Sequence, residues 1–324
     1  MGDARESGLI PGHNRLVLAP SAPPEIQRVL DLLPAPVHEL RSLAGPGRPW
    51  LVRYGAEAVV LRRTDADRLR SFTQEIALAS VRWLHAFLLD LSAGGFVAPT
   101  PVPHLQGDSL AVVDGAICEL LSFVPGRPMG WGDDKSIHES GRLLARFHDG
   151  SLATRARAQR PGALPLRLCR PSRADAPVAE IERELAEIGY DAELQTVVHG
   201  DATNSNVVVD AGVYRFVDFA LAYKEALTAD IGFALWRNGR ADSDAITYDA
   251  ARVAQFVRGY ASLRPLRSAS ARAIVVYMKG RGLQLQHRLE LRHGSDETIM
   301  QRLNSIQRQQ LELERAIATA LSSA

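Results

Sequence analysis

Asp201, Asn206 and Asp218 are the residues of this sequence whose types and spacing best suit chemistry. The first two lie in the stretch HGDATNSN, which begins at His199 and runs directly into a Val-Val-Val segment. Loops between elements favour Asp, Asn, Ser and Gly, so a turn alone would account for the stretch. A metal and phosphate site would account for it too, and the surrounding elements have to decide between the two.

The residues after this stretch predict an isolated β-hairpin, with strands at 207–209 and 213–219 joined by an Asp-Ala-Gly turn. Such a hairpin would bring Asn206 and Asp218 side by side at its outer end. Two oxygen ligands suit Mg²⁺, which keeps water and substrate phosphate in its other positions. Asp201 is then free to orient an attacking hydroxyl or to take its proton. Phosphoryl transfer needs this combination of metal ligands and an orienting group.

The pattern H-G-D, four residues, N, and a later D-F pair resembles the catalytic loop and metal segment of the aminoglycoside phosphotransferase and choline kinase group. The resemblance implies that Asp201 is the catalytic residue and that Asn206 and Asp218 bind Mg²⁺. It also implies ATP or GTP as the phosphoryl donor and the hydroxyl of a small molecule as the acceptor.

Further matches extend the resemblance over roughly residues 37–240, in the family's order. Residues 141–148, GRLLARFH, are similar to the family's helix ending in L-A-x-x-H, and His148 is expected to be structural. Thr-Ala-Asp230-Ile resembles the later element whose Asp supports the catalytic loop, together with His199. Residues 123–126, FVPG, resemble the segment just beyond the nucleotide hinge, which implies that Ser122, Phe123 and Val124 contact the nucleotide.

The elements around these motifs predict an α+β, two-lobed protein-kinase-like fold, with a sheet-rich N-lobe and a mainly helical C-lobe. We expect a loosely ordered segment at 1–24, the N-lobe at 25–121 and the C-lobe at 122–324. The N-lobe pattern predicts two helices, at 25–33 and 67–91, and five strands, at 37–43, 50–54, 58–63, 110–113 and 116–123. The C-lobe pattern predicts helices at 135–148, 176–188, from 229 onward and, with Ser295 as its N-cap, from 295.

The expected nucleotide site departs from the family's commonest pattern. No lysine precedes position 135, so Arg62 takes the place of the usual lysine, while Arg63 points to the opposite face of the strand. Glu75 is either the partner that holds Arg62 or an ordinary exposed helix residue. The turn containing Gly47 and Arg48 is either a phosphate clamp or a simple turn, because its prolines offer no N–H.

Composition limits the other classes of function. The formal net charge is +1, which argues against a nucleic-acid binder. The two cysteines stand far apart, so no disulfide framework or zinc pair is indicated. No apolar run approaches the length of a membrane span, and we therefore expect a cytoplasmic protein that does not bind membranes. The oligomeric state is not indicated by the sequence.

The acceptor is the least determined property. We expect an antibiotic hydroxyl, on a sugar or nucleoside portion, because the arginine-rich composition suits a GC-rich bacterium of the kind that disarms antibiotics. Arginines are mixed with the C-lobe acids, which favours an antibiotic less cationic than an aminoglycoside. A metabolic homoserine- or choline-type kinase is the alternative, and a nucleotide-binding pseudokinase is the alternative from another class. Four acidic residues could meet a cationic substrate, but we expect them at the solvated surface: Asp133, Asp134, Asp175 and Glu225.

Overall fold

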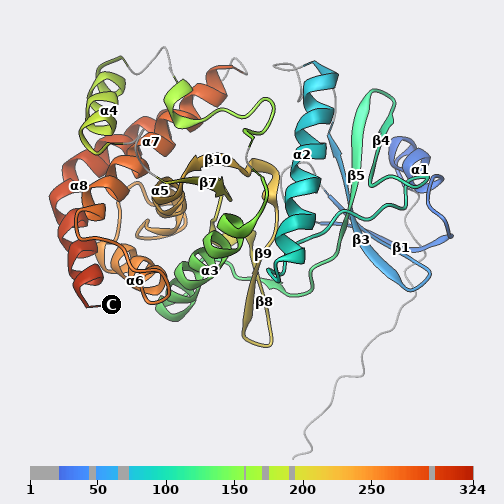
Figure 1. Ribbon diagram of the computed structural model, residues 1–324, viewed down its shortest axis with the longest axis horizontal. Coiled ribbons are helices and arrows are strands. Elements are labelled where there is room, and N and C mark those ends of the chain that lie inside the picture. Colours follow the sequence, from blue (N-terminus) through green and yellow to red (C-terminus); the bar gives the residue numbers. More distant parts are fainter. Residues whose placement is uncertain are drawn as a thin grey trace, which may run out of the picture. The chain divides into compact units, whose positions relative to one another are not determined.

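The computed structural model describes residues 22–43, 49–64, 73–156, 158–169, 175–189, 194–291 and 296–323 (Figure 1). Most of the segment expected to be loosely ordered, together with Gly47 and Arg48, lies outside these residues. The chain divides into two compact units. One comprises Met1–Thr64 with Val102–Leu121, and the other comprises Asp65–Pro101 with Ser122–Ala324.

The first unit is built on a five-stranded sheet with the strand order β1-β2-β3-β5-β4. The pairs β1–β2, β2–β3 and β4–β5 are antiparallel. The elements of this unit are α1 (Pro24–Leu30), β1 (Val37–Ser42), β2 (Trp50–Tyr54), β3 (Glu57–Thr64), β4 (Leu110–Val113) and β5 (Ala116–Ser122). These are the strands that the sequence predicts, to within one residue at each end.

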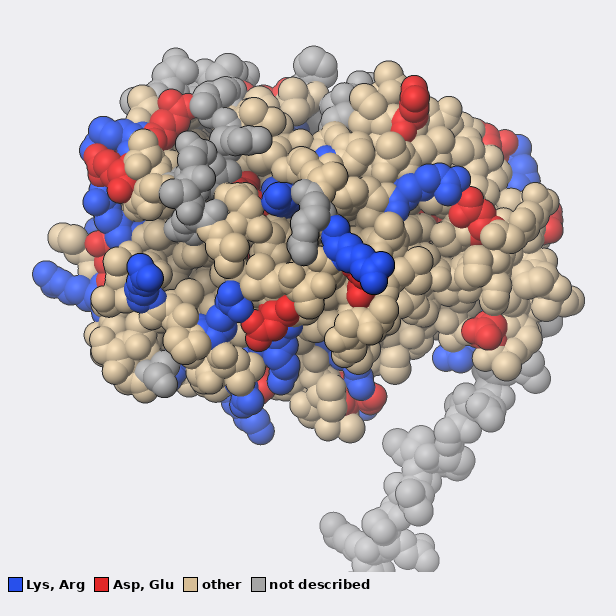
Figure 2. All heavy atoms as spheres, viewed as in Figure 1, with Lys and Arg blue, Asp and Glu red and all other residues tan. Residues whose placement is uncertain are grey.

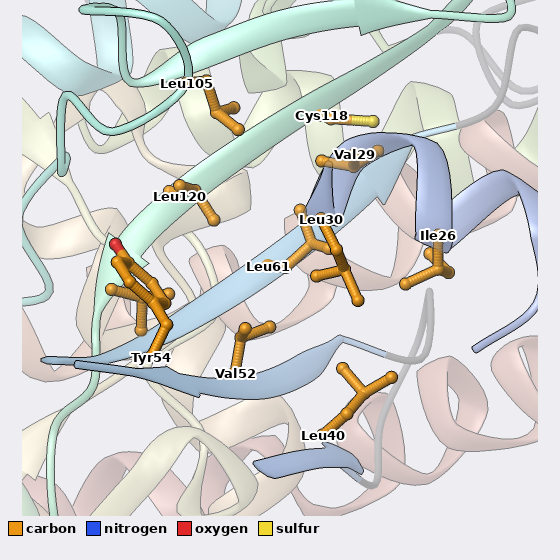
Figure 3. Packing of buried hydrophobic residues seen from close by; sticks show 11 residues of the cluster. Ile26, Val29, Leu30, Leu40, Val52, Tyr54, Leu61, Leu105, Cys118 and Leu120 are labelled. Carbon is orange, nitrogen blue, oxygen red and sulfur yellow. The ribbon is translucent and has the colours of Figure 1, made fainter. Parts of the chain in front are cut away.

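Helix α1 covers one face of this sheet, where its apolar side chains meet those of the strands (Figure 3). Val59 and Leu61 of β3 and Leu120 of β5 belong to this core and are fully buried. Because side chains alternate along a strand, Arg62 and Glu119 lie on the face opposite the core. The sheet therefore separates an apolar face from a face that carries charge.

The second unit is mainly helical. Helix α3 packs on α6, α5 packs on α7, and α8 packs on both α6 and α7. Its helices are α2 (Gln74–Ala93), α3 (Asp134–Ala153), α4 (Asp175–Glu187), α5 (Leu227–Asn238), α6 (Ala250–Ala261), α7 (Ser270–Glu290) and α8 (Glu297–Ser322). Helix α2 groups with this unit by its contacts, although the sequence assigns it to the N-lobe.

Two small sheets in the second unit carry the loop that begins at His199. Strand β7 (Gln195–Val198) pairs antiparallel with β10 (Tyr223–Ala226). Strand β8 (Val207–Asp210) pairs with both β9 (Val213–Phe216) and β6 (Arg127–Pro128). The expectation of an isolated hairpin is therefore wrong. The strands β6, β7 and β10 were not predicted, because two to four residues give too short a pattern to identify alternation.

Helices α2, α3 and α8 begin or end at other residues than predicted, and in α2 and α8 the side chain that caps the N-terminus explains the difference. The N-cap of α8 is Asp296, whose side chain accepts a hydrogen bond from the N–H of Thr298, and not Ser295. Helix α3 continues past Gly150 to Ala153. Helix α2 begins after Thr73, whose hydroxyl accepts from the N–H of Ile76.

Helix α2 meets length and composition criteria for a membrane span, contrary to the expectation from the sequence. Core helices pass the same test, and α2 buries Leu84, Phe87, Leu88 and Leu91 on one side. Its length and composition are therefore weak support for a span.

Candidate functional site

The loop from His199 to Asp201 is anchored to the buried carboxylate of Asp230 on α5. Asp230 accepts from the backbone N–H of His199 at 2.7 Å and from that of Gly200 at 3.0 Å. It also contacts Nε2 of His148 on α3 at 3.1 Å. Burial acts to raise the pKa of Asp230, but hydrogen bonds from His148 and from the His199 backbone outweigh it and hold the pKa below its ordinary value.

The imidazole of His199 is enclosed by aromatic rings. The ring centroids of Phe216 and Phe219 each lie 4.6 Å from that of His199, which is fully buried. Burial lowers the pKa of His199, although three nearby carboxylates act in the opposite direction. Its Nδ1 accepts from the N–H of Asp201 at 3.3 Å. His199 therefore contacts the loop from within the core, and its supporting role stays a prediction.

Gly200 is required by both conformation and space. Its φ is +72°, in the left-handed region that side chains disfavour. A Cβ atom built there would lie 2.2 Å from the carbonyl oxygen of Leu221, which is backbone and cannot rotate away. The glycine thus lets the loop approach the segment that follows Asp218.

Asp201 and Asn206 are joined directly. Nδ2 of Asn206 donates to the backbone oxygen of Asp201 and to its Oδ2, both at 2.9 Å. The Asp201 side chain is 34% exposed, so an acceptor from solvent can reach it. Because the amide nitrogen of Asn206 is used in this way, its Oδ1 is the amide atom left for a cation.

The last backbone hydrogen bond of the hairpin runs from the N–H of Val217 to the carbonyl oxygen of Asn206, at 2.8 Å. Asp218 is the next residue after Val217 in the chain. Strand β9 ends at Phe216, earlier than predicted, because Asp218 adopts a left-handed conformation with φ 58°. Its Oδ1 accepts from the N–H of Ala220 at 3.3 Å. The bond from Val217 to Asn206 thus brings the backbone of Asp218 close to Asn206 at the hairpin's open end, just beyond the paired strands.

The donor chemistry of this corner fits a hard divalent cation. An amide oxygen from Asn206 and a carboxylate from Asp218 are oxygen ligands, which Mg²⁺ prefers. Among the described residues no group of three or more His, Cys, Asp or Glu could hold a metal. A cation here would therefore take its remaining ligands from water and a phosphate-bearing substrate, as Mg²⁺ commonly does.

A network around Asn204 and Asn238 fixes the middle of the loop, and the sequence did not reveal it. The N–H of Asn204 donates to Oδ1 of Asn238 at 2.9 Å, and Nδ2 of Asn238 donates to the oxygen of Ala202 at 3.1 Å. Nδ2 of Asn204 donates to the oxygen of Trp131 at 2.6 Å, and the guanidinium of Arg252 lies 4.4 Å from the Trp131 ring centre. Asn238 stands 34 residues from Asn204, so spacing gives no signal.

Two arginines distant in sequence complete the second unit's site. Nη1 of Arg160 donates to the oxygens of Ala220 and Ala222, at 2.7 and 3.0 Å, and thereby holds the segment after Asp218. Nη2 of Arg281 on α7 lies 3.2 Å from Oδ1 of Asp201, and the Arg281 side chain is only 3% exposed. Neither arginine lies in a recognisable motif, and only the packing of α7 brings Arg281 to Asp201.

The residues expected to bind nucleotide are known only by their contacts within the protein. Nε of Arg62 lies 3.7 Å from Oε1 of Glu119 within the first unit. Glu75 belongs to the second unit, so its predicted pairing with Arg62 stays a prediction. Ser122 forms hydrogen bonds with Thr100. Its backbone N–H donates to the carbonyl oxygen of Thr100, and its hydroxyl accepts from the N–H of Thr100 and contacts the Thr100 hydroxyl. Phe123 is partly exposed and Val124 is nearly buried, and their contact with nucleotide also stays a prediction.

Glu225 corrects one expectation, because it is fully buried rather than solvated. Its Oε2 accepts from the N–H of Leu166 at 2.8 Å and from the hydroxyl of Tyr223 at 3.2 Å. The carboxylate therefore ties the segment before α4 to strand β10 and does not meet a substrate from solvent.

Solved structures with the same fold include kinases of small molecules. A microcompartment-associated aminopropanol kinase aligns with a TM-score of 0.65 and 18% identity, over 91% of this chain and 98% of that chain. An amicoumacin kinase, solved with AMP-PNP and Ca²⁺, aligns with a TM-score of 0.64 and 16% identity, over 90% of this chain and 92% of that chain. At these identities the likeness concerns the fold, which is the α+β kinase-like fold that the sequence predicts.

Curated relatives are more similar in sequence. The homoserine kinase of Gluconacetobacter diazotrophicus is 31% identical over 242 residues, which cover 68% of this chain and 73% of that protein. The homoserine kinase of Phenylobacterium zucineum is 30% identical over 232 residues, which cover 67% and 68%. These relatives favour the metabolic alternative over the antibiotic acceptor.

The family model described as the phosphotransferase enzyme family matches residues 49–266. The match takes in β2 and β3 of the first unit and the whole loop and hairpin around Asp201, Asn206 and Asp218. The chain belongs to this phosphotransferase family.

Proposed function

We propose that this protein transfers the γ-phosphoryl group of ATP to the hydroxyl of a small amino acid of the homoserine type. The observation that carries the proposal is the arrangement of Asp201, a partly exposed carboxylate bonded to Asn206 beside the hairpin's open end. The homoserine kinases similar to this chain support the choice of acceptor.

Asp201 is assigned to the acceptor. A hydrogen bond from Asn206 and the ion pair with Arg281 position its carboxylate, which can accept a hydrogen bond from the acceptor hydroxyl. As that hydroxyl oxygen bonds to the γ-phosphorus, the bond from phosphorus to the leaving oxygen of the nucleotide breaks. The hydroxyl proton passes to Asp201, which acts as the general base.

Asn206 and Asp218 are assigned to Mg²⁺, which when bound neutralises charge on the phosphates. The contributions of the protein are to leave Oδ1 of Asn206 available, by engaging Nδ2 with Asp201, and to fix Asp218 in its left-handed turn. ATP rather than GTP is proposed on the support of the AMP-PNP in the solved amicoumacin kinase.

An antibiotic acceptor has less support. A polycationic aminoglycoside would favour a strongly acidic surface around the site. On the face shown in Figure 2, acidic and basic side chains of the described residues are interspersed rather than gathered by sign. The curated relatives described above are homoserine kinases by name.

A coupled assay of ADP formation tests the proposal. The purified protein, with ATP and Mg²⁺, is offered L-homoserine, choline, amino alcohols and a panel of hydroxylated antibiotics. We expect the highest kcat/KM for L-homoserine or a close amino-acid analogue, and mass spectrometry should find the phosphate on its hydroxyl oxygen.

Turnover confined to an antibiotic would overturn the proposed amino-acid acceptor. The same conclusion would follow if expression of the gene protected a sensitive bacterium from an antibiotic and the purified protein phosphorylated no amino acid. Absence of turnover with every acceptor, together with measurable ATP binding, would instead support the pseudokinase alternative.

A further inference from the structure

Several contacts hold the side chain of Arg281 beside Asp201. Its Nη2 lies 3.2 Å from Oδ1 of Asp201, its Nη1 donates to Oε1 of Gln284, and its guanidinium lies 5.5 Å from the ring centre of Phe233. The charge of this nearly buried arginine is therefore balanced by Asp201. This leaves Asp201 with one oxygen facing Arg281 and one facing Asn206.

Arg288 lies two helical turns further along α7. Positions 281, 284 and 288 share one face of the helix, because residues three, four and seven apart lie above one another. Between the two arginines, Nε2 of Gln284 donates to the oxygen of Leu164 at 2.9 Å and to the hydroxyl of Tyr223 at 2.8 Å. Gln284 thus has protein partners of its own and does not serve Arg288.

Arg288 has no carboxylate partner within ion-pairing distance among the residues that the structure describes. Its side chain is partly buried. Burial, and secondly the charge of Arg281, lower the pKa of Arg288 to about 10, while Tyr223, Cys169 and Asp201 act in the opposite direction. The guanidinium is therefore charged at neutral pH and lies within the electrostatic reach of both Arg281 and Asp201.

A partly buried cation without a counterion is costly, and an anionic ligand removes that cost. Arg281 and Arg288 lie on one face of α7, and Asp201 neutralises the charge of Arg281. The charge of Arg288, which has no counterion among the described residues, lies on the helix that supplies Arg281 to Asp201, the residue assigned to the acceptor.

We propose that Arg288, with Arg281 beside it, binds a carboxylate of the acceptor while the acceptor's hydroxyl meets Asp201. The proposal rests on the proposed function, because it uses Asp201 as the group that receives the hydroxyl. It assigns to the site a substrate class, the hydroxy acids, which a positively charged site would bind in preference to a polycation. A guanidinium also binds phosphate, so the nucleotide is the rival ligand, and the experiment has to separate the two.

The experiment compares two acceptors that differ by one group. L-homoserine carries the carboxylate, and the unbranched aminopropanol with terminal hydroxyl and amino groups is the same molecule without it. KM and kcat are measured for both acceptors and for ATP, in the wild type and in Arg288→Ala and Arg288→Lys. Arg272→Ala is the matched control, because Arg272 is an exposed arginine on the same helix that pairs with Glu187 at the surface.

In Arg288→Ala we expect KM for L-homoserine to rise on the order of ten- to a hundredfold, as for a lost charge-assisted hydrogen bond. KM for aminopropanol and KM for ATP should stay unchanged, Arg288→Lys should recover part of the loss, and Arg272→Ala should match the wild type. An equal rise for both acceptors, or a rise in KM for ATP instead, would overturn the proposal.

A binding measurement keeps this inference separate from the proposed function. Isothermal titration calorimetry with γ-hydroxybutyrate and its neutral amide needs no turnover. Binding of the acid alone, lost in Arg288→Ala, would support the carboxylate site even if L-homoserine were not phosphorylated. Equal binding of acid and amide, no binding of the acid to the wild type, or no loss in the variant would refute it.

Discussion

At the scale of single residues, the site depends on carboxylates whose partners define their roles. Asp201 is partly exposed and is held by Asn206 and Arg281, whereas Asp230 is buried and holds the backbone of the loop. The same side chain type therefore has a proposed role in substrate chemistry in one place and holds the loop in the other. Exposure separates the two roles.

Asp201→Asn tests the chemical role of the first carboxylate. The amide keeps an oxygen for Asn206 but cannot take a proton, so kcat should fall on the order of 10²–10⁴-fold. Binding of ATP, measured by titration calorimetry, should stay near the wild-type value. A variant with unchanged kcat would remove Asp201 from the mechanism.

Arg62→Ala tests whether this arginine replaces the lysine that the family usually carries. If Arg62 contacts the nucleotide phosphates, KM for ATP should rise roughly tenfold in the variant, because a charge-assisted contact is lost. Its neighbour Arg63 points to the other face of β3, so Arg63→Ala is the control and should leave KM for ATP nearly unchanged. Equal effects at both positions would contradict the assignment.

At the scale of elements, short strands and tight turns position the site while long helices anchor it. The loop from His199 lies between β7 and the three-stranded sheet of β6, β8 and β9, and α5 supplies both Asp230 and Asn238 as anchors. Gly200 stands where the loop approaches the backbone of Leu221 too closely to admit a Cβ atom. The geometry of the site therefore depends on one residue without a side chain.

Gly200→Ala should disturb both stability and activity. The left-handed conformation alone costs about 1–2 kcal/mol for a residue with a Cβ, and contact with the Leu221 oxygen adds to that cost. Gly212→Ala is the matched control, because Gly212 also has a positive φ but has nothing within 4 Å of the added Cβ.

The free energy of unfolding, measured with denaturant, and kcat are compared for the two variants and the wild type. The control should lose only the conformational cost and keep its kcat, while Gly200→Ala should lose more stability and most activity. Equal losses in stability with full activity in both variants would mean that the loop tolerates the displacement.

At the scale of the whole molecule, buried ionisable groups couple folding to pH. The pKa of His199 is lowered by burial from 6.5, its value in a model compound. Between that value and the lower native one, the unfolded chain binds more protons than the folded chain. The free energy of unfolding therefore falls as the pH falls through this range.

Urea unfolding between about pH 7.5 and pH 5.5 should show this loss, since the range spans the ordinary histidine pKa. His199→Asn should have a shallower dependence, because the titrating group is gone, whereas the exposed His38→Asn should follow the wild type. Asp230, whose native pKa is lowered, should cause a further loss as the pH falls below about 3.9. Identical slopes for His199→Asn and the wild type would exclude His199 as the cause.

The sequence alone was sufficient to predict the motif and most of the helices and strands that carry it. A local pattern identified the stretch HGDATNSN, the hairpin after it and the strands of the first sheet, since alternation and turn residues act between near neighbours in the chain. It also indicated the family by the resemblance of this pattern, and the match of the family model over residues 49–266 confirms that family.

Contacts between distant segments were decided by tertiary packing. Arg281 reaches Asp201 across 80 residues, and Asn238 reaches Asn204 across 34, with no local pattern to announce either. Glu225 has the residue type of a surface acid, yet its hydrogen bonds to Leu166 and Tyr223 allow it to be buried. Such pairings depend on which helix faces pack together, and that is a property of the folded chain as a whole.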